Sequence, residues 1–376
     1  MHNGQWPEHA VTLQKLMVAC LALMMTVQAA AQSAATWRTT THDFGTFDEK
    51  EGKRSCSFVV TNTGDSALLI VGVRSSCGCT VAEHTTEPIA PGSMGTVNVT
   101  FTPTGRPGPF EKDVWVHTNS TPNRNRLTIK GVVRGSKETV SRYFPASAGE
   151  PLHFTTLTMA AGEVKKGQLR NNLTSVYNSG GDTLVITFDN NTSHIKAHAS
   201  PDTIAPSGVA TMTFFFDSRR TPVWGINDDE ISIVARRLGQ ADTVAVARAS
   251  IVTNVVEDFS GMSAKQLAAA PVCSVSTRHL LMRGLVAGTV AQSTIAIENT
   301  GKSDLVVRRA MPLDKAVKCK CDSTLLKPGD KATVTVMVNP DMVEGKLLNS
   351  HIEVITNDPY NPRIAVRVVA EKDDKW

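Results

Sequence analysis

Two Cys-x-Cys pairs are the parts of this sequence most suited to chemistry. One is Cys77-Gly78-Cys79 and the other is Cys319-Lys320-Cys321. An apolar run precedes each pair, and a turn containing Pro-Gly follows it. We interpret the second pair as a copy of the first and expect both to belong to a repeated module.

Three kinds of chemistry suit such pairs, and the sequence leaves all three open. The first is a structural disulfide, or buried thiols that seal one end of a fold. The Cα atoms of Cys77 and Cys79 would lie about 6.5–7 Å apart in an extended strand, at the limit for a bridge, and Gly78 allows a closer bend. The second is a soft-metal site for copper(I) or zinc, and the third is disulfide exchange with another protein. The metal candidates are Cys77, Cys79, Cys319 and Cys321.

Six cysteines other than Cys20 are candidates for disulfide or redox chemistry. They are Cys56, Cys77, Cys79, Cys273, Cys319 and Cys321. Three in each outer module allow at most one bridge and one spare thiol per module, unless modules cross-link. Cys56 lies on the apolar face of an alternating strand and is expected to point inward. The flanking Lys318 and Lys320 are expected to favour the reactive thiolate, and His84 is a candidate fourth metal ligand beside Cys56, Cys77 and Cys79.

Motifs of known enzyme classes do not occur. The sequence has no Gly-x-Ser-x-Gly, no His-Glu-x-x-His and no phosphate-binding loop. His42, Asp43 and Ser55 have the residue types of a catalytic triad, but nothing in the sequence brings them together. We therefore predict a protein that is not an enzyme and has no cofactor, apart from the copper or zinc alternative.

The elements that must position the cysteines are short strands. Period-two alternation broken by Gly, Pro and Asn predicts about seven strands per module, as in an immunoglobulin-like sandwich. We predict an all-β chain of three tandem modules, at residues 36–134, 143–256 and 272–371. The middle module has no cysteine, and His194 and His198 stand near the place of the pair. These two histidines are interpreted as part of a strand edge, with a metal site as the alternative.

The N-terminus predicts export. Lys15 precedes a short apolar segment that ends in Gln28-Ala29-Ala30-Ala31, which is typical of a signal peptide over residues 1–31. Cys20 is a poor lipid-attachment candidate because most of the apolar segment follows it. We expect the mature chain to lie in the periplasm or at the cell-envelope surface, with no transmembrane segment. The net charge of +4, without basic clusters interleaved with aromatic residues, argues against nucleic-acid binding.

Five segments occur in an order that resembles a known family. They are Phe44-Gly45-Thr46-Phe47, Asn62-Thr63-Gly64-Asp65, Ser76-Cys77-Gly78-Cys79-Thr80, Ile89-Ala90-Pro91-Gly92 and Val99-Thr100-Phe101-Thr102-Pro103. Together they resemble the bacterial Cys-Gly-Cys immunoglobulin-like family catalogued as domain of unknown function one-five-seven-three. That family is similar to the Hydin-type and major-sperm-protein-type sandwiches, which serve mainly as interaction modules. The third module matches in part, with Lys320 in place of the central glycine. The resemblance implies a fold and an envelope location, and no reaction.

The sequence therefore predicts an exported, non-enzymatic scaffold or adaptor of the cell envelope. It would bind other envelope proteins through strand edges and loops. The alternative is a thiol-based redox or copper- or zinc-handling protein that uses the Cys-x-Cys pairs.

Overall fold

The computed structural model of this chain describes residues 32–189 and 192–373. The predicted signal peptide and Cys20 lie outside these residues. The chain divides into two compact units, the first ending at Ser136 and the second beginning at Lys137. No helix in the described ranges is long and apolar enough to cross a membrane.

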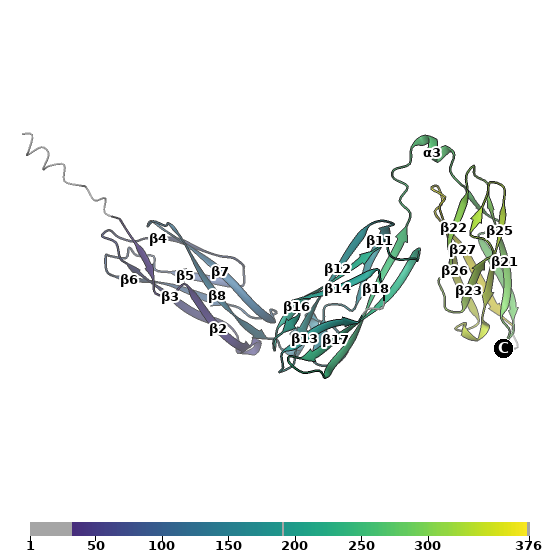
Figure 1. The fold of residues 1–376 in the computed structure, drawn as a ribbon. Helices are drawn as coiled ribbons and strands as arrows, with labels where there is room; N and C mark the ends of the chain where they lie inside the picture. Colours follow the sequence, from purple (N-terminus) through teal and green to yellow (C-terminus); the bar gives the residue numbers. More distant parts are fainter. Residues whose placement is uncertain (1–31, 190–191, 374–376) are drawn as a thin grey trace, which may run out of the picture. The chain divides into compact units, whose positions relative to one another are not determined.

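The first unit is a sandwich of two four-stranded sheets, which Figure 1 shows face to face. One sheet has the strand order β1-β3-β6-β5 and the other has the order β2-β8-β7-β4. A short 3-10 helix, η1 (Glu49–Glu51), follows β2. The strands are β1 (Ala35–Trp37), β2 (Thr41–Asp48), β3 (Arg54–Asn62), β4 (Ile70–Ser75), β5 (Thr80–His84), β6 (Met94–Phe101), β7 (Gly108–Thr118) and β8 (Arg124–Arg134).

Alternation along β3 and β6 forms the core of this first sandwich. Successive side chains of a strand point to opposite faces, so the apolar residues of each strand all face inward. Phe58 and Val60 on β3 and Val97, Val99 and Phe101 on β6 are almost completely buried. The same rule places serine and threonine on the outer face of this sheet.

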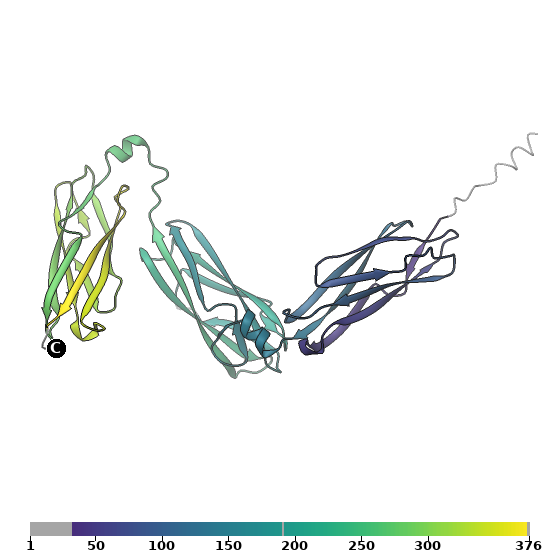
Figure 2. The same ribbon diagram turned by 180° about the vertical axis from the view of Figure 1, so that it is seen from behind.

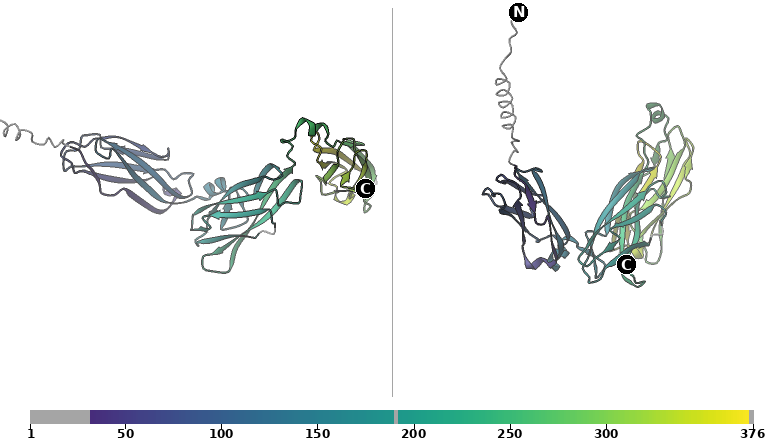
Figure 3. Two further views of the ribbon diagram at one scale, coloured as in Figure 1. Left: turned by 45° about the horizontal axis from the view of Figure 1, so that its top comes forward. Right: turned by 60° about the vertical axis from the view of Figure 1, so that its left-hand side comes forward.

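The second module contains two five-stranded sheets, seen from further directions in Figure 3. Their strand orders are β14-β16-β12-β10-β9 and β11-β18-β17-β13-β15. The strands are β9 (Ala146–Ser147), β10 (Leu152–Phe154), β11 (Thr158–Lys165), β12 (Leu169–Asn178), β13 (Leu184–Asp189), β14 (Ile195–Ser200), β15 (Thr203–Ile204), β16 (Val209–Asp217), β17 (Gly225–Arg237) and β18 (Thr243–Val256).

The third module repeats the plan with sheets ordered β19-β21-β25-β23 and β20-β27-β26-β22-β24. The 3-10 helix η2 (Pro340–Met342) follows β25. The strands are β19 (Cys273–Val275), β20 (His279–Leu285), β21 (Ala291–Asn299), β22 (Leu305–Pro312), β23 (Val317–Cys321), β24 (Leu325–Leu326), β25 (Lys331–Val338), β26 (Leu347–Thr356) and β27 (Arg363–Lys372). The predicted fold class, tandem immunoglobulin-like β-sandwiches, is confirmed.

Two short helices lie outside the sandwiches. Helix α3 (Ala264–Ala268) lies in the segment between the second and third modules. Helix α2 (Lys137–Tyr143) was not predicted, because its seven residues look like a polar linker. Its buried Val140 forms a small apolar cluster with Phe144 and Tyr177, which ties the helix to the second module. Figure 2 shows the helix beside the strands of that module.

The repeated Asn-x-Gly segments are corner-forming devices rather than simple turns. In the first module the Asn62 amide donates to the carbonyls of Ser66 (2.8 Å) and Ile89 (2.9 Å), and it accepts from the Gly64 N–H (3.0 Å). Asn178 and Asn299 make the same three kinds of bond in their modules. All three side chains are completely buried. One asparagine thus fastens the end of a central strand to the following turn in each sandwich.

A second shared feature is a bulge in the strand that pairs in parallel with the last strand of each module. The register shifts within β2, β11 and β20. Gly45, Gly162 and Gly284 lie at these shifts with φ between 65° and 70°, a region that favours glycine. The extra residues interrupt the strand at the edge of its sheet.

Within the second unit, an ion pair, a cation–π contact and hydrogen bonds join the second and third modules. The Arg308 guanidinium forms an ion pair with Glu257 (3.0 Å) and lies 4.7 Å above the centre of the Trp224 ring. Arg309 donates to the carbonyl oxygens of Trp224 and Ile226, at 3.0 Å in each case. These contacts connect β22 with the strand that begins at Gly225.

Candidate functional site

The Cys-Gly-Cys segment forms a tight turn between β4 and β5. The Thr80 N–H donates to the Cys77 carbonyl (3.3 Å), and a disulfide joins Cys77 to Cys79 with their Cα atoms 5.3 Å apart. The chain is therefore bent at Gly78 instead of extended. Cys79 is buried, whereas Cys77 is half-buried.

Neighbouring backbone and hydroxyl groups hold this turn in place. Ser76 exchanges two bonds with Asp113 of β7, one from its own N–H (2.8 Å) and one to its hydroxyl (3.1 Å). The hydroxyl of Thr80, which is 2% exposed, lies 3.6 Å from the Cys77 sulfur and 3.7 Å from the Cys79 sulfur. The turn therefore sets the position at which β5 begins.

The second Cys-x-Cys pair is not a structural copy of the first, so that interpretation was wrong. Cys319 and Cys321 lie in the extended strand β23, opposite Val336 and Val334, and both thiols are free. The positions in the first module that match them in the sheet are Ala82 and His84 of β5. Spacing in the sequence already separates the pairs, because Cys79 stands twelve residues before its turn proline and Cys321 only seven.

The expected activation of these thiols by lysine is also wrong. Lys318 and Lys320 alternate with the cysteines along β23, so they point out to solvent while the thiols face the core. Burial raises the pKa of Cys319 to about 11, with a smaller opposing effect from Arg309. Burial likewise raises the pKa of Cys321, whose thiol donates to the Ser323 carbonyl (3.0 Å). Both thiols are therefore protonated at neutral pH.

The two remaining cysteines are core groups. Cys56 packs against the first core as predicted, and burial raises its pKa to about 11. Cys273 opens β19 and is buried, which raises its pKa to about 12. Both thiols are free. Arg278 acts in the opposite direction on the pKa of Cys273, but its effect is smaller than that of burial.

The metal candidates do not come together. Over the described ranges, no three His, Cys, Asp or Glu side chains are grouped as a metal site would require. His84 sits on β5 at the position equivalent to Cys321, while Cys77 and Cys79 are bonded to each other. The proposed set of Cys56, Cys77, Cys79 and His84 is therefore dispersed.

The middle-module histidines also separate. His194 is buried, with its ring 3.1 Å from Asp229 and edge-on to Phe216. His198 is exposed on the outer face of β14. His198 lies on β14 and His194 just before that strand, and the two rings face different environments.

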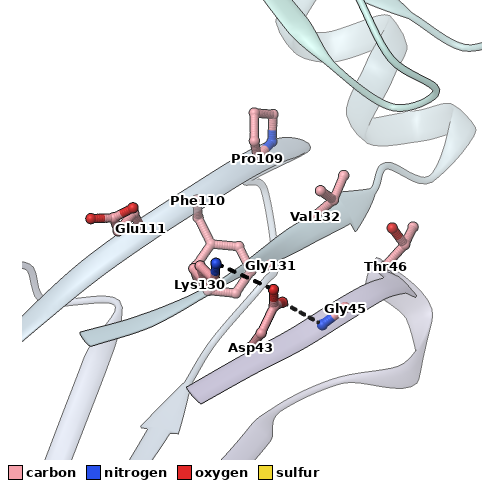
Figure 4. A pocket seen from close by; sticks show the side chains of 9 residues that line it. All are labelled: Asp43, Gly45, Thr46, Pro109, Phe110, Glu111, Lys130, Gly131 and Val132. Carbon is pink, nitrogen blue, oxygen red and sulfur yellow. Dashed lines mark hydrogen bonds and ion pairs between the residues drawn. The ribbon is translucent and has the colours of Figure 1, made fainter. Parts of the chain in front are cut away.

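A groove in the first module lies beside the Gly45 bulge, and Figure 4 shows its lining. It encloses about 580 Å³ and is open to solvent. Lys130 pairs with Asp43 (3.6 Å), which also accepts from the Gly45 N–H (2.8 Å), so these charged groups satisfy one another. Gly131 is required here, since a Cβ would lie 2.9 Å from the Gly45 carbonyl oxygen and 3.1 Å from the Phe110 ring. The groove reflects close strand packing rather than a set of reactive groups.

The triad drawn from sequence is not assembled. His42 packs edge-on against Phe44, Asp43 binds Lys130, and Ser55 shares a hydrogen bond with Thr100. Each of the three side chains has a separate partner.

The least protected features of the sandwiches are certain sheet edges, which sequence reasoning did not locate. Most edge strands are guarded: β2, β11, β20 and β4 carry register shifts, and β1, β9, β15, β19 and β24 have two or three residues. The edge strands that pair without interruption are β5, β14 and β23, one in each module. Such strands are templates for pairing with another chain.

The fold defines this chain as a series of immunoglobulin-like sandwiches, and comparisons with known families agree. Residues 35–133 match the model of the family described as protein of unknown function (DUF1573), which confirms the resemblance seen in the first module. Residues 271–371 match the model described as a HYDIN/CFA65/VesB-like, Ig-like domain. A search of curated proteins gives no match.

Solved structures also resemble this chain. A protein of unknown function from Porphyromonas gingivalis W83 is 19% identical, with a TM-score of 0.47, over 59% of this chain and 99% of the other. A PapD-like domain of human CEP192 is 10% identical, with a TM-score of 0.25, over 30% of this chain and 92% of the domain. An endo-fucoidan hydrolase of glycoside hydrolase family 107 is 11% identical, with a TM-score of 0.27 over 91% of this chain. The match spans only 44% of that hydrolase. At these identities none of the three assigns an activity here.

Proposed function

We propose that this protein is an exported, non-enzymatic scaffold or adaptor of the cell envelope that binds other proteins through its strand edges. The observation that carries the proposal is the uninterrupted edge strand in each sandwich, β5, β14 and β23. Their outward backbone groups can pair with an extended segment of a partner, which adds a strand to the sheet.

Two further observations support a binding role rather than a catalytic one. Reactive side chains in the described ranges are paired, as Asp43 is, buried, as Cys319 is, or dispersed, as are the three residues of the candidate triad. The family models that match are immunoglobulin-like domains or a family of unknown function. The signal-peptide-like N-terminal sequence supports the proposal of export to the periplasm or the envelope surface.

The thiol-based alternative is less well supported by the geometry. The free thiols are protonated at neutral pH because burial raises their pKa, and no group of three ligands forms in the described part of the chain. Of the two disulfide-bonded cysteines, Cys77 is half-buried and Cys79 is buried. Replacing Cys77 and Cys79 with serine distinguishes the two functions, because an adaptor keeps its partners while a redox protein loses its activity.

The test of the adaptor function is cross-linking of the full chain in its native envelope. We expect the same protein neighbours in repeated experiments. The proposal is abandoned if no reproducible protein neighbour is captured, or if the chain is recovered from the cytoplasm.

A further inference from the structure

We propose that β5 of the first module is a peptide-binding edge that selects an extended segment carrying an apolar residue and, two positions away, a lysine or arginine. This inference rests on the proposed function and narrows it to one strand and one kind of partner. Three features of β5 support it: the direction of its backbone groups, the side chains at the edge, and an exposed carboxylate.

The first observation is the direction of the backbone groups along β5. The Thr102 N–H donates to the Cys79 carbonyl (2.9 Å), and the Thr85 N–H donates to the Thr96 carbonyl (3.0 Å). In an antiparallel pair the bonded residues alternate, so the odd-numbered residues of β5 bond to β6. The N–H and C=O groups of Ala82 and His84 therefore point away from β6, toward the open edge.

The second observation compares the three uninterrupted edges. Exposed lysine is a common device that discourages unwanted pairing at a sheet edge. The outward side chains of β23 are Lys318 and Lys320, and those of β14 include Lys196. The outward side chains of β5 are Val81, which is 59% exposed, and Glu83. Among these three edges, only β5 lacks an exposed lysine, and only β5 exposes an apolar side chain.

The third observation concerns charge. Glu83 is exposed, and no ion pair forms at its carboxylate within the part of the chain described here. Its neighbours on the outer face are uncharged, namely Asn98 and Thr100, each bonded to a serine of β3. A cation on an incoming strand directly opposite Glu83 would meet a carboxylate with no competing partner.

The ligand follows from these positions. Val81 and Glu83 face the same side and are two residues apart, so a paired strand places its own residues opposite them at the same spacing. Cross-strand pairing favours a β-branched or aromatic residue opposite Val81 and a basic residue opposite Glu83. The Cys77–Cys79 turn holds the first residue of the edge, Thr80, in place.

The chain offers a closely matched pair of variants. Ala82 and Ala197 each stand nine residues before the proline of the following turn, Pro91 and Pro206. The Asp217 N–H donates to the His194 carbonyl (2.7 Å), so by the same alternation the Ala197 N–H also points to an open edge, that of β14. Ala82→Pro and Ala197→Pro each remove one outward N–H without removing a sheet bond.

The experiment uses the mature full chain and short end-blocked peptides that are rich in threonine. One set carries valine and lysine two positions apart, in both orders, and the control set has glutamate in place of lysine. Binding is followed by NMR shifts of the Ala82 and His84 amides. We expect these amides to shift, binding roughly threefold to tenfold tighter for the lysine peptides, and the opposite preference in Glu83→Lys. Ala82→Pro should abolish binding, and Ala197→Pro should leave it unchanged.

Several outcomes overturn the proposal. It fails if no peptide shifts the Ala82 or His84 amide, if Ala82→Pro binds as well as the unaltered chain, or if lysine and glutamate peptides bind equally. Concentration-dependent protection of these amides without peptide would show that a second copy occupies the edge instead. If the Ala82→Pro variant captures the same envelope proteins as the unaltered chain, the adaptor function stands and only the assignment of binding to β5 is wrong.

Discussion

Replacing Asn62 with alanine tests the central claim about the fold, that one buried amide fastens each sandwich corner. The side chain is 0% exposed and makes three hydrogen bonds. Each neutral bond contributes about 1 kcal/mol net. The Ile89 carbonyl retains its bond from the Leu68 N–H (2.9 Å), which limits the penalty for unpaired groups. We therefore expect Asn62→Ala to lower the free energy of unfolding of the first module by about 2–4 kcal/mol.

The assay is native-state hydrogen exchange followed by peptide mass spectrometry on the full chain, because unfolding of several modules is not a single transition. A loss of about 2–4 kcal/mol accelerates exchange of the best-protected amides of β3 and β6 by roughly 30-fold to 1,000-fold. Amides of β21 and β25 in the third module should not change. The matched control is Asn98→Ala, an exposed asparagine bonded to Ser57 (2.6 Å), expected within about 0.5 kcal/mol of the unaltered chain. Equal exchange in Asn62→Ala and Asn98→Ala would refute the reasoning.

Three other changes have defined outcomes. Replacing both Cys77 and Cys79 with serine should destabilise the first module by only roughly 1–2 kcal/mol, because the bridge closes a very short loop, with a sequence separation of 2. The same exchange assay measures this, and a loss above about 4 kcal/mol would contradict it. Burial raises the pKa of Cys319 to about 11 and that of Cys273 to about 12, so their contribution to stability is fully present below the ordinary thiol pKa of 9.0 and is lost as pH rises through the folded values. Iodoacetamide should therefore label both thiols much more slowly in the native chain than in urea at pH about 8, and equal rates would be inconsistent with burial. Gly131→Ala should lower the free energy of unfolding of the first module by about 1–3 kcal/mol, because the added Cβ clashes with its neighbours. Gly72→Ala, where a Cβ meets nothing within 4 Å, should leave it nearly unchanged, and thermal melts of the two variants test the difference.

Much of the architecture was predictable because strand alternation is a local property. The run from Cys56 to Val60 alternates, and the structure buries Phe58 and Val60 and turns Cys56 inward, as that pattern indicates. Turn residues marked the ends of many strands. Helix α2 was missed because a seven-residue amphipathic segment carries too little periodic signal to distinguish it from a linker.

The chemistry of the cysteines was less predictable, because it depends on pairing register. Lys320 is adjacent to two cysteines in sequence, but it points to the opposite face of β23, and the thiol pKa follows burial instead. The apparent likeness of the two Cys-x-Cys pairs concealed a shift of five residues relative to the following turn. That count was available from the sequence, whereas its consequence, a turn in one module and a strand in the other, is visible only in the sheets.

Residue type and short-range spacing specify turns and alternation, so the all-β class, the Asn-x-Gly turns at Asn62, Asn178 and Asn299 and the cysteine inventory could be read from the sequence alone. The edge strands of the sheets, and the direction in which their backbone groups point, became visible only in the folded chain. Val81, Ala82 and Glu83 look like any other strand in sequence. They form an open edge because β5 pairs with β6 on one side and with no strand of the described residues on the other. Strand order is set by contacts between residues far apart in the chain, and no local pattern encodes it.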